Sequence, residues 1–399
     1  MLIGIVGKTN TGKSTFFKAA TLAEIEIANR PFVTIKPHHG CGFVKIKAVA
    51  DEFKVKPNPK FGYYLNGYRF VPVDLLDVAG LIPGAHKGLG LGNQFLDDLR
   101  QADVLVHVID ASGSSNEVGE PAPPGSYDPA NDIKFLEEEI DFWFLGILKK
   151  GWERFAKQMQ QEHKDIVREI AKQFSGLKIT EDIVKDAVKK LNLPVDKVIN
   201  WTEDNLLEFS RELRKASKPM IIAANKADVE GADKNIEKLK KEFPDYIIIP
   251  CSAESELALR EAAKHDLISY VPGENDFKTT VDDKLNAQQK KGLEFIKKNV
   301  LKKYKNTGVQ EVLDKAVFEL LKYIAVYPVA TSKLEDKDGN KLPDCHLVPE
   351  ETTALEFAYR VHSDIGDNFV RAIDLKTKKV IGKDSEVKHR DVIEIVTSK

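Results

Sequence analysis

The sequence predicts an α/β protein with a doubly wound sheet, a helical insertion within that sheet and a smaller α+β module after it. Three observations lead to this prediction. Short apolar runs recur through the first 250 residues, helical patterns separate them, and the alternation stops after Pro272 and Gly273. The length of 399 residues also exceeds what one hydrophobic core usually holds, so two or three domains are expected.

Five apolar runs are expected to form the strands of the sheet. Most of them lack alternation of apolar and polar residues, which is typical of parallel strands covered on both faces. The runs are residues 2–6, 68–77, 104–110, 219–225 and 246–250.

A long segment, residues 112–217, interrupts this order. It begins with a stretch rich in Gly, Pro, Ser and Asn, which predicts a loop. Apolar residues then recur at helical spacing from Trp152 to Phe174, with Gly176 ending the helix, and again from Ile183 to Leu191. We therefore expect a coiled-coil-like antiparallel hairpin. Residues 134–218 contain 17 Lys plus Arg and 16 Asp plus Glu, which favours a solvated arm over the alternative, a basic binding surface.

The end of the chain has a different pattern. Residues 282–325 are expected to form one or two helices, and a short helix over 352–362 lies among short strands. We therefore predict an α/β domain in two parts, 1–130 and 218–325 with its connecting helices. The helical insertion is assigned to 131–217 and the α+β module to 326–399.

Residues 7–14, GKTNTGKS, match the phosphate-loop pattern GxxxxGK[ST] directly after the first strand. In such a loop, backbone N–H groups and the positive end of the following helix bind phosphates. Lys13 is expected to supply charge to the transferred phosphate, and the Ser14 hydroxyl to ligate Mg²⁺. The predicted nucleotide contacts here are Gly7, Lys8, Thr9, Asn10, Thr11, Gly12, Lys13, Ser14 and Thr15.

Two further segments are expected near the γ-phosphate. Asp77 ends the second strand, where ligands of open α/β sheets bind, and Gly80 follows three residues later. Asp77 would hold Mg²⁺ through water, and the Gly80 N–H would contact the γ-phosphate. Thr34 is the candidate third metal ligand with Ser14 and Asp77, joining only when a γ-phosphate is present; the alternative is a loop threonine with no metal role.

The base is expected to be read by residues 225–228, NKAD, which follow another strand. The Asp228 carboxylate can accept both the ring N–H and the exocyclic amine of guanine, and adenine offers no such donor pair. Asn225 and Lys226 belong to the same motif. After the next strand, Ser252, Ala253 and Glu254 are expected to contact the guanine carbonyl through the backbone. Together these residues predict GTP as the ligand.

The catalytic group is harder to identify. Many GTPases place a glutamine directly after DxxG to orient water, but here that residue is Leu81. Hydrolysis, with Lys13 and Gly80 contacting the phosphate, should therefore be slow or use another group. Asn10 fits the loop pattern of GTPases that bind K⁺ beside the phosphates; the alternative is an Asn10 that only caps the loop.

The composition argues against several classes of protein. A net charge of −2 argues against a wholesale nucleic-acid binder, and no sequence-specific DNA binding is expected. No apolar run approaches the roughly 18 residues of a membrane span. The three widely separated cysteines, Cys41, Cys251 and Cys345, indicate neither disulfides nor a metal site and fit a reducing, cytoplasmic environment.

Three segments resemble the YchF-type branch of the Obg GTPase family. Residues 77–103 are similar to its glycine-rich switch segment, PFVTIKP to its PFTTxxPN, and the tail to its β-grasp TGS domain. The resemblance implies a P-loop GTPase, a hydrophobic residue after DxxG, and the ribosome or its RNA as partner. Many members have lost the guanine-reading Asp and take ATP, whereas Asp228 is retained here. His38 and His86 depart from the pattern without touching an identified phosphate contact.

Two functions remain in competition. The first is a GTP-driven switch that docks on the ribosome or RNA through the TGS and helical modules. The second is a stand-alone nucleotide hydrolase whose tail contacts protein only. Residues 322–399 contain 13 Lys plus Arg and 14 Asp plus Glu, so local charge does not choose between them. A P-loop kinase is disfavoured because NKAD has no role in such an enzyme.

Overall fold

The computed structural model describes residues 1–22, 38–78, 92–162, 164–281, 285–330, 333–336 and 338–398. These residues form two compact units, each built from two separate stretches of chain. The first unit contains 1–17 and 75–254, and the second contains 18–74 and 255–399. None of the helices in the described ranges has both the length and the apolar character that a membrane crossing requires.

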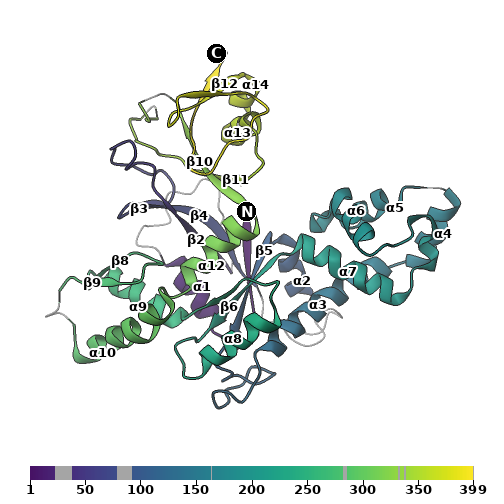
Figure 1. The fold of residues 1–399 in the computed structure, drawn as a ribbon, viewed down its shortest axis with the longest axis horizontal. Helices are drawn as coiled ribbons and strands as arrows, with labels where there is room; N and C mark the ends of the chain where they lie inside the picture. Colours follow the sequence, from purple (N-terminus) through teal and green to yellow (C-terminus); the bar gives the residue numbers. More distant parts are fainter. Residues whose placement is uncertain are drawn as a thin grey trace. The chain divides into compact units, whose positions relative to one another are not determined.

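A parallel sheet forms the core of the first unit (Figure 1). Its strands follow the order β4–β1–β5–β6–β7, and β4 contributes only its carboxyl end to this unit. The pairings β1–β5, β5–β6 and β6–β7 are all parallel. The strands are β1 (Leu2–Val6), β4 (Tyr68–Asp77), β5 (Val104–Asp110), β6 (Met220–Asn225) and β7 (Ile248–Pro250). All five predicted strands are confirmed.

The sheet is parallel because helices connect its strands, and β5 and β6 are buried along their whole length, as their unbroken apolar sequence predicts. Helices α2 (Gly92–Gln101) and α8 (Ala232–Glu242) belong to this unit, as does the first half of α1 (Lys13–Thr21). Helix α9 (Ala253–Lys264) begins in this unit and continues in the second.

The helical insertion between β5 and β6 is larger than the predicted hairpin. Its α-helices are α3 (Ala130–Lys149), α4 (Trp152–Glu162), α5 (Ile166–Gln173), α6 (Glu181–Lys190) and α7 (Glu203–Ser217). Helices α3 and α7 pack together, and Arg214 of α7 forms ion pairs with Asp141 (2.8 Å) and Glu137 (2.9 Å) of α3.

The prediction of a single helix from Trp152 to Phe174 is wrong. Asp165 accepts hydrogen bonds from the backbone N–H groups of Val167 (2.9 Å) and Arg168 (3.4 Å), so its carboxylate begins a new helix, α5. The predicted second helix is confirmed as α6, which Thr180 caps in the same way.

The second unit contains strands that the sequence did not reveal. They are β2 (His39–Lys47), next to β4, and β3 (Tyr63–Leu65), which pairs with β4; a separate pair is β8 (Ile268–Tyr270) with β9 (Phe277–Thr279). One or two helices were expected within 282–325, and the structure has α10 (Ala287–Ile296), which continues through a π turn into α11 (Lys302–Tyr304), and then α12 (Val309–Lys315).

The C-terminal module of this unit has a mixed sheet in the order β11–β10–β14–β12–β13. Helix α13 places Phe357 in a core with Ala372 and Ile393, where all three are buried. The elements are β10 (Tyr323–Val329), β11 (His346–Pro349), α13 (Ala354–Val361), α14 (Ser363–Asp367), β12 (Phe369–Asp374), β13 (Lys379–Ile381) and β14 (Val392–Thr397). The short helix and strands expected here are confirmed.

Candidate functional site

The candidate site lies at the carboxyl ends of the parallel strands of the first unit. The predicted phosphate loop follows β1, the predicted metal-binding carboxylate ends β4, and the predicted base-reading segments follow β6 and β7. Because neighbouring parallel strands end at the same edge of the sheet, segments far apart in sequence meet there.

The loop between β1 and α1 is tight, and two glycines make it so. A Cβ on Gly7 would collide with the backbone carbonyl of Val108, and one on Gly12 would collide with the side-chain amide of Asn225. Gly12 also has φ +89°, a conformation that other residues rarely adopt. Inside the loop, the Thr11 hydroxyl donates to the Lys8 carbonyl at 3.0 Å. Only glycine therefore fits at these two positions.

Lys13 and Asp77, predicted from separate motifs, are in contact. The Lys13 ammonium forms an ion pair with the Asp77 carboxylate and donates to the Val78 carbonyl at 2.8 Å. Lys13 begins α1, so its charge adds to the positive end of that helix. Ser14 follows with an exposed side chain.

The residues present fit a magnesium-bound nucleotide. A glycine loop that a Cβ would fill, a helix N-terminus, an ammonium and a carboxylate are together at one strand end, and oxygen ligands suit Mg²⁺. Thr34, Gly80, Leu81 and His86 lie outside the described residues. His38 is exposed in a turn at φ 67°.

Asn225 joins three of the predicted segments. Its Nδ2 donates to the Thr11 carbonyl at 2.8 Å, and its Oδ1 accepts from the Ala253 N–H at 3.0 Å. Only 4% of Asn225 is exposed. Removing this side chain would leave a buried carbonyl and a buried N–H without a partner, so Asn225 fixes the predicted phosphate loop against both predicted base-reading segments.

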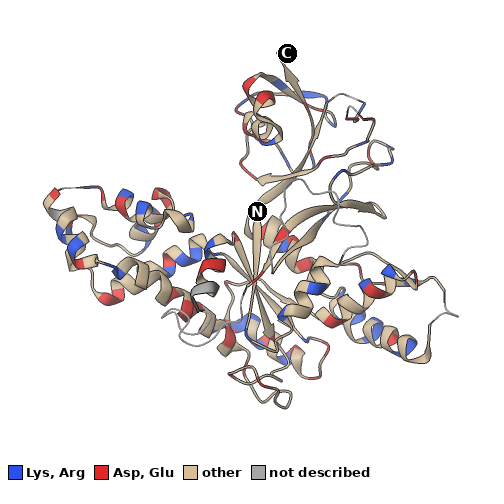
Figure 2. Ribbon diagram, turned by 180° about the vertical axis from the view of Figure 1, so that it is seen from behind, with Lys and Arg blue, Asp and Glu red and all other residues tan. Residues whose placement is uncertain are grey.

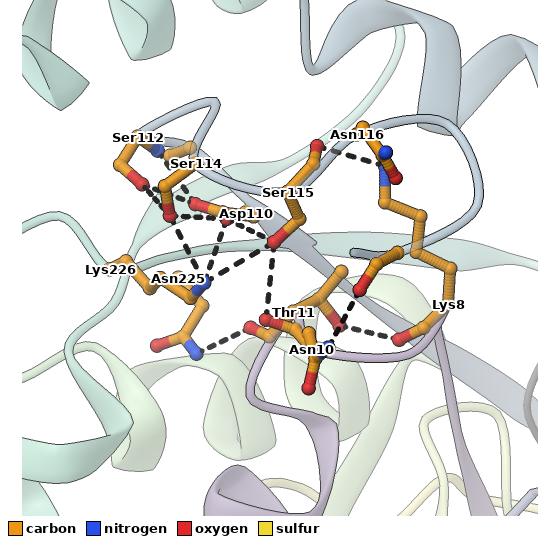
Figure 3. Close-up of polar contacts among 12 residues, drawn as sticks. Lys8, Asn10, Thr11, Asp110, Ser112, Ser114, Ser115, Asn116, Asn225 and Lys226 are labelled. Carbon is orange, nitrogen blue, oxygen red and sulfur yellow. Dashed lines mark hydrogen bonds and ion pairs between the residues drawn. The ribbon is translucent and has the colours of Figure 1, made fainter. Parts of the chain in front are cut away.

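Lys226 contacts the carboxylate of Asp110, a residue that was not predicted from the sequence. Its ammonium forms an ion pair of 2.7 Å with Asp110, the last residue of β5 (Figure 3). The hydroxyls of Ser112, Ser114 and Ser115 also lie within hydrogen-bond distance of the Asp110 carboxylate, at 2.5 to 2.9 Å. Burial raises the pKa of Asp110, but the contact with the Lys226 ammonium and the hydrogen bonds from Ser112 and Ser115 outweigh it and hold the pKa below its usual value.

Asp228 is in a different environment from Asp110. It is half-buried, and among the described residues its carboxylate has no hydrogen-bond or ion-pair partner. The adjacent Ala227 N–H donates to the Cys251 carbonyl at 2.9 Å, which ties this loop to the end of β7. In the next segment Ser252 and Ala253 are buried and Glu254 is exposed.

The side chains of Lys8 and Asn10 take roles that were not predicted. Lys8 is buried in an ion pair with Asp132 of α3 at 2.8 Å, so its ammonium is committed to the protein. The Asn10 amide donates to the Gly119 carbonyl at 2.7 Å. The first part of the loop after β5, residues 112–120, therefore belongs to the site. The one sequence signal for it was an aspartate at a strand end followed by several serines.

Family models match most of the chain. A model for an Obg-like GTPase, the YGR210-like G4 motif-containing domain, matches residues 223–331. A model for a 50S ribosome-binding GTPase matches residues 2–140, and a TGS domain model matches 337–397.

Curated and solved relatives agree with these models. An uncharacterized GTP-binding protein of Methanocaldococcus jannaschii is 50% identical over 100% of this chain and 99% of its own length. The ribosome-binding ATPase YchF of Bacillus subtilis is 31% identical over 66% of this chain and 69% of its own. The crystal structure of a GTP-binding protein from Pyrococcus horikoshii is 40% identical, with a TM-score of 0.78 and full coverage of both chains.

Proposed function

Because this chain belongs to the YchF-type branch of the Obg-like GTPase family, we propose that it binds GTP with Mg²⁺, hydrolyses it slowly and acts as a nucleotide-dependent switch. The observation that carries this proposal is the state of Asp228. The Asp228 carboxylate is half-buried and has no partner in the described part of the chain, and its loop is tied to the phosphate loop through Asn225, so it can accept hydrogen bonds from a ligand.

Guanine satisfies this carboxylate better than adenine. Its ring N–H and exocyclic amine can both donate to Asp228, whereas adenine would leave the carboxylate desolvated and without a donor pair. Such an unpaired group costs about 1–3 kcal/mol or more, which corresponds to a preference of roughly fivefold to 150-fold or higher.

The phosphates and the metal would be held at the other end of the site. Backbone N–H groups of residues 7–13 and the Lys13 ammonium are the candidate phosphate ligands, and Ser14 and Asp77 are the candidate metal ligands, with Thr34 as the third. Mg²⁺ bound there would neutralise phosphate charge. Since Lys13 is paired with Asp77, nucleotide binding requires Lys13 to exchange part of that contact for phosphate oxygens.

Slow hydrolysis follows from Leu81, whose side chain cannot orient water. A K⁺ ion beside Asn10 is the proposed substitute for a catalytic group. The Asn10 Nδ2 donates to the Gly119 carbonyl, and the amide oxygen is the atom that would ligate the K⁺ ion. If K⁺ acts there, GTP turnover should be faster in KCl than in NaCl. Equal rates would leave Asn10 with the role of a loop cap only.

The proposed partner is the ribosome or its RNA. Support comes from the family model of a ribosome-binding GTPase over residues 2–140 and from the Bacillus subtilis relative named as ribosome-binding. Charge gives no independent support, because Lys and Arg are mixed with Asp and Glu along helices α3–α7 (Figure 2). Co-sedimentation with ribosomes tests this part, with pelleting expected with a non-hydrolysable GTP analogue and not with GDP.

A second candidate is an ATPase. One relative that is 31% identical is named an ATPase, whereas the relative that is 50% identical is named GTP-binding. Titration of the protein with GTP and with ATP separates the two. Tighter binding of GTP supports the proposed function, and equal or tighter binding of ATP supports the second candidate.

A further inference from the structure

The segment after β5, residues 112–120, contacts both halves of the site. It begins next to Asp110 and ends in a turn against the phosphate loop. We propose that this segment is a positioning element for the nucleotide, which fixes the phosphate loop through Gly119 and the base-reading lysine Lys226 through Asp110. The proposal rests on the proposed function, because it assigns a role at the same nucleotide site.

The turn contacts two consecutive residues of the phosphate loop. The Asn10 amide donates to the Gly119 carbonyl at 2.7 Å, and the Thr9 hydroxyl donates to the Val118 carbonyl at 3.3 Å. Asn10 has φ 61°, a conformation that asparagine tolerates better than most residues. These two contacts therefore support the loop at and next to the residue with this left-handed backbone conformation.

The turn has its own internal support. Asn116 Oδ1 accepts the backbone N–H groups of Val118 (3.2 Å) and Glu120 (2.8 Å), and the Gly119 N–H donates to the Asn116 carbonyl at 3.0 Å. Such an asparagine-centred turn presents its carbonyls in fixed directions. The Gly119 carbonyl is thereby preorganised to accept from Asn10.

The first residues of the segment, 112–115, are linked to Lys226 through Asp110. Ser115 Oγ lies 2.6 Å from an Asp110 carboxylate oxygen and 3.3 Å from the Asn10 carbonyl, so one hydroxyl lies between the carboxylate and the phosphate loop (Figure 3). Asp110 is 1% exposed and holds the Lys226 ammonium at 2.7 Å. A displacement of this segment therefore moves the phosphate ligands and the base-reading loop together.

Two glycines of this loop provide a matched pair of variants. Gly119 and Gly125 have φ values of +83° and +79°, so an alanine strains the backbone similarly at each. A Cβ at Gly119 would collide with the Thr9 side chain and lie 2.8 Å from the Thr9 carbonyl, whereas a Cβ at Gly125 meets nothing within 4 Å. Only Gly119→Ala pushes on the phosphate loop.

The test is the affinity of the full chain for GDP and for a non-hydrolysable GTP analogue. Gly119→Ala should weaken both by about tenfold or more, equal to roughly 1.4 kcal/mol, while Gly125→Ala stays within about twofold of wild type. Equal affinities of the two variants would overturn the positioning role. If the wild-type chain bound no guanine nucleotide, the proposed function itself would fail.

Ser115→Ala serves as a second variant that adds no bulk. It removes the hydroxyl between Asp110 and the Asn10 carbonyl. The KM for GTP should rise several-fold with kcat within about twofold, because the lost contact orders the binding loop without touching the reacting atoms. A fall in kcat with an unchanged KM would contradict a positioning role, as would unchanged values of both. Ser115→Thr, which keeps the hydroxyl, should restore the KM.

Discussion

Lys8 and Asp132 form an ion pair of 2.8 Å in which each side chain is only 5% exposed. The Lys8 ammonium also lies 3.8 Å from the centre of the Tyr127 ring, and the Tyr127 hydroxyl donates to Asp132 at 2.9 Å. Lys8 is the second residue of the phosphate loop, and Asp132 lies in the first turn of α3. The helical insertion is thus anchored directly to the phosphate loop by a buried charge pair.

Asp132→Ala should destabilise the protein strongly, because it leaves the Lys8 ammonium buried without a counter-charge. Losing one partner of a buried pair costs roughly 3–5 kcal/mol, whereas replacing both with apolar residues is often far less harmful. Urea denaturation of Asp132→Ala, Lys8→Met and the double variant measures this. The double variant should lose much less stability than the sum of the two single losses, and simple additivity would contradict the buried pair.

His107 should make the protein less stable in acid. It is buried in β5, and burial together with the nearby Lys8 charge lowers its pKa from 6.5 to about 3. The unfolded chain gains a proton below pH 6.5 that the folded chain refuses, so stability falls as the pH falls, by up to about 1.4 kcal/mol per pH unit. His107→Leu removes this contribution to the pH dependence of stability. Urea denaturation between pH 7.5 and 5 should give a flatter dependence for the variant, and parallel curves would refute the assignment.

Gly12→Ala should abolish nucleotide binding. The new Cβ would collide with the Asn225 amide, which is itself bonded to the Thr11 carbonyl, and the residue would be strained at φ +89°. Gly151→Ala is the matched control, because Gly151 also has positive φ, +76°, and its Cβ would meet nothing within 4 Å. Calorimetric titration with GDP should show binding for the control alone. If Gly12→Ala kept its affinity for GDP, the loop would have space for a Cβ at this position, which contradicts the structure.

Thr353→Ala should destabilise the C-terminal module without changing nucleotide affinity. Thr353 caps α13, accepting from the Glu356 N–H at 3.3 Å while the Glu356 side chain accepts from the Thr353 N–H at 2.8 Å. Loss of such a cap costs about 1 kcal/mol. The melting temperature reports this loss, and Thr353→Ser should restore it. A change in GDP affinity instead would indicate that the module reaches the nucleotide site.

The sequence predicts a structural element best where one residue pattern determines one structure. Unbroken apolar runs identified the parallel strands, and the GKTNTGKS and NKAD motifs follow β1 and β6 at the edge of the sheet where the sequence placed them. The sequence did not predict β2, whose segment HGCGFVKIK contains two glycines. It also did not predict α3, because this helix buries charged residues such as Glu139 and Asp141 beside apolar ones and so lacks a clear polar face.

Within the site, the missed residues depend on partners far away in sequence. Asp110 pairs with Lys226 across 116 residues and Lys8 with Asp132 across 124, and no local pattern encodes either pair. The loop over residues 112–128 was correctly predicted as a loop, but its composition did not reveal that Gly119 contacts Asn10.

The most direct test of the central claim, a guanine-selecting switch, is the ratio of GTP to ATP affinity in the wild type and in Asp228→Ala. Glu230→Ala, which removes an exposed charge two residues away, is the control. The wild type and the control should prefer GTP by roughly tenfold or more, and Asp228→Ala should lose most of that preference through weaker GTP binding. Equal affinities in the wild type, or an unchanged ratio in Asp228→Ala, would contradict the account.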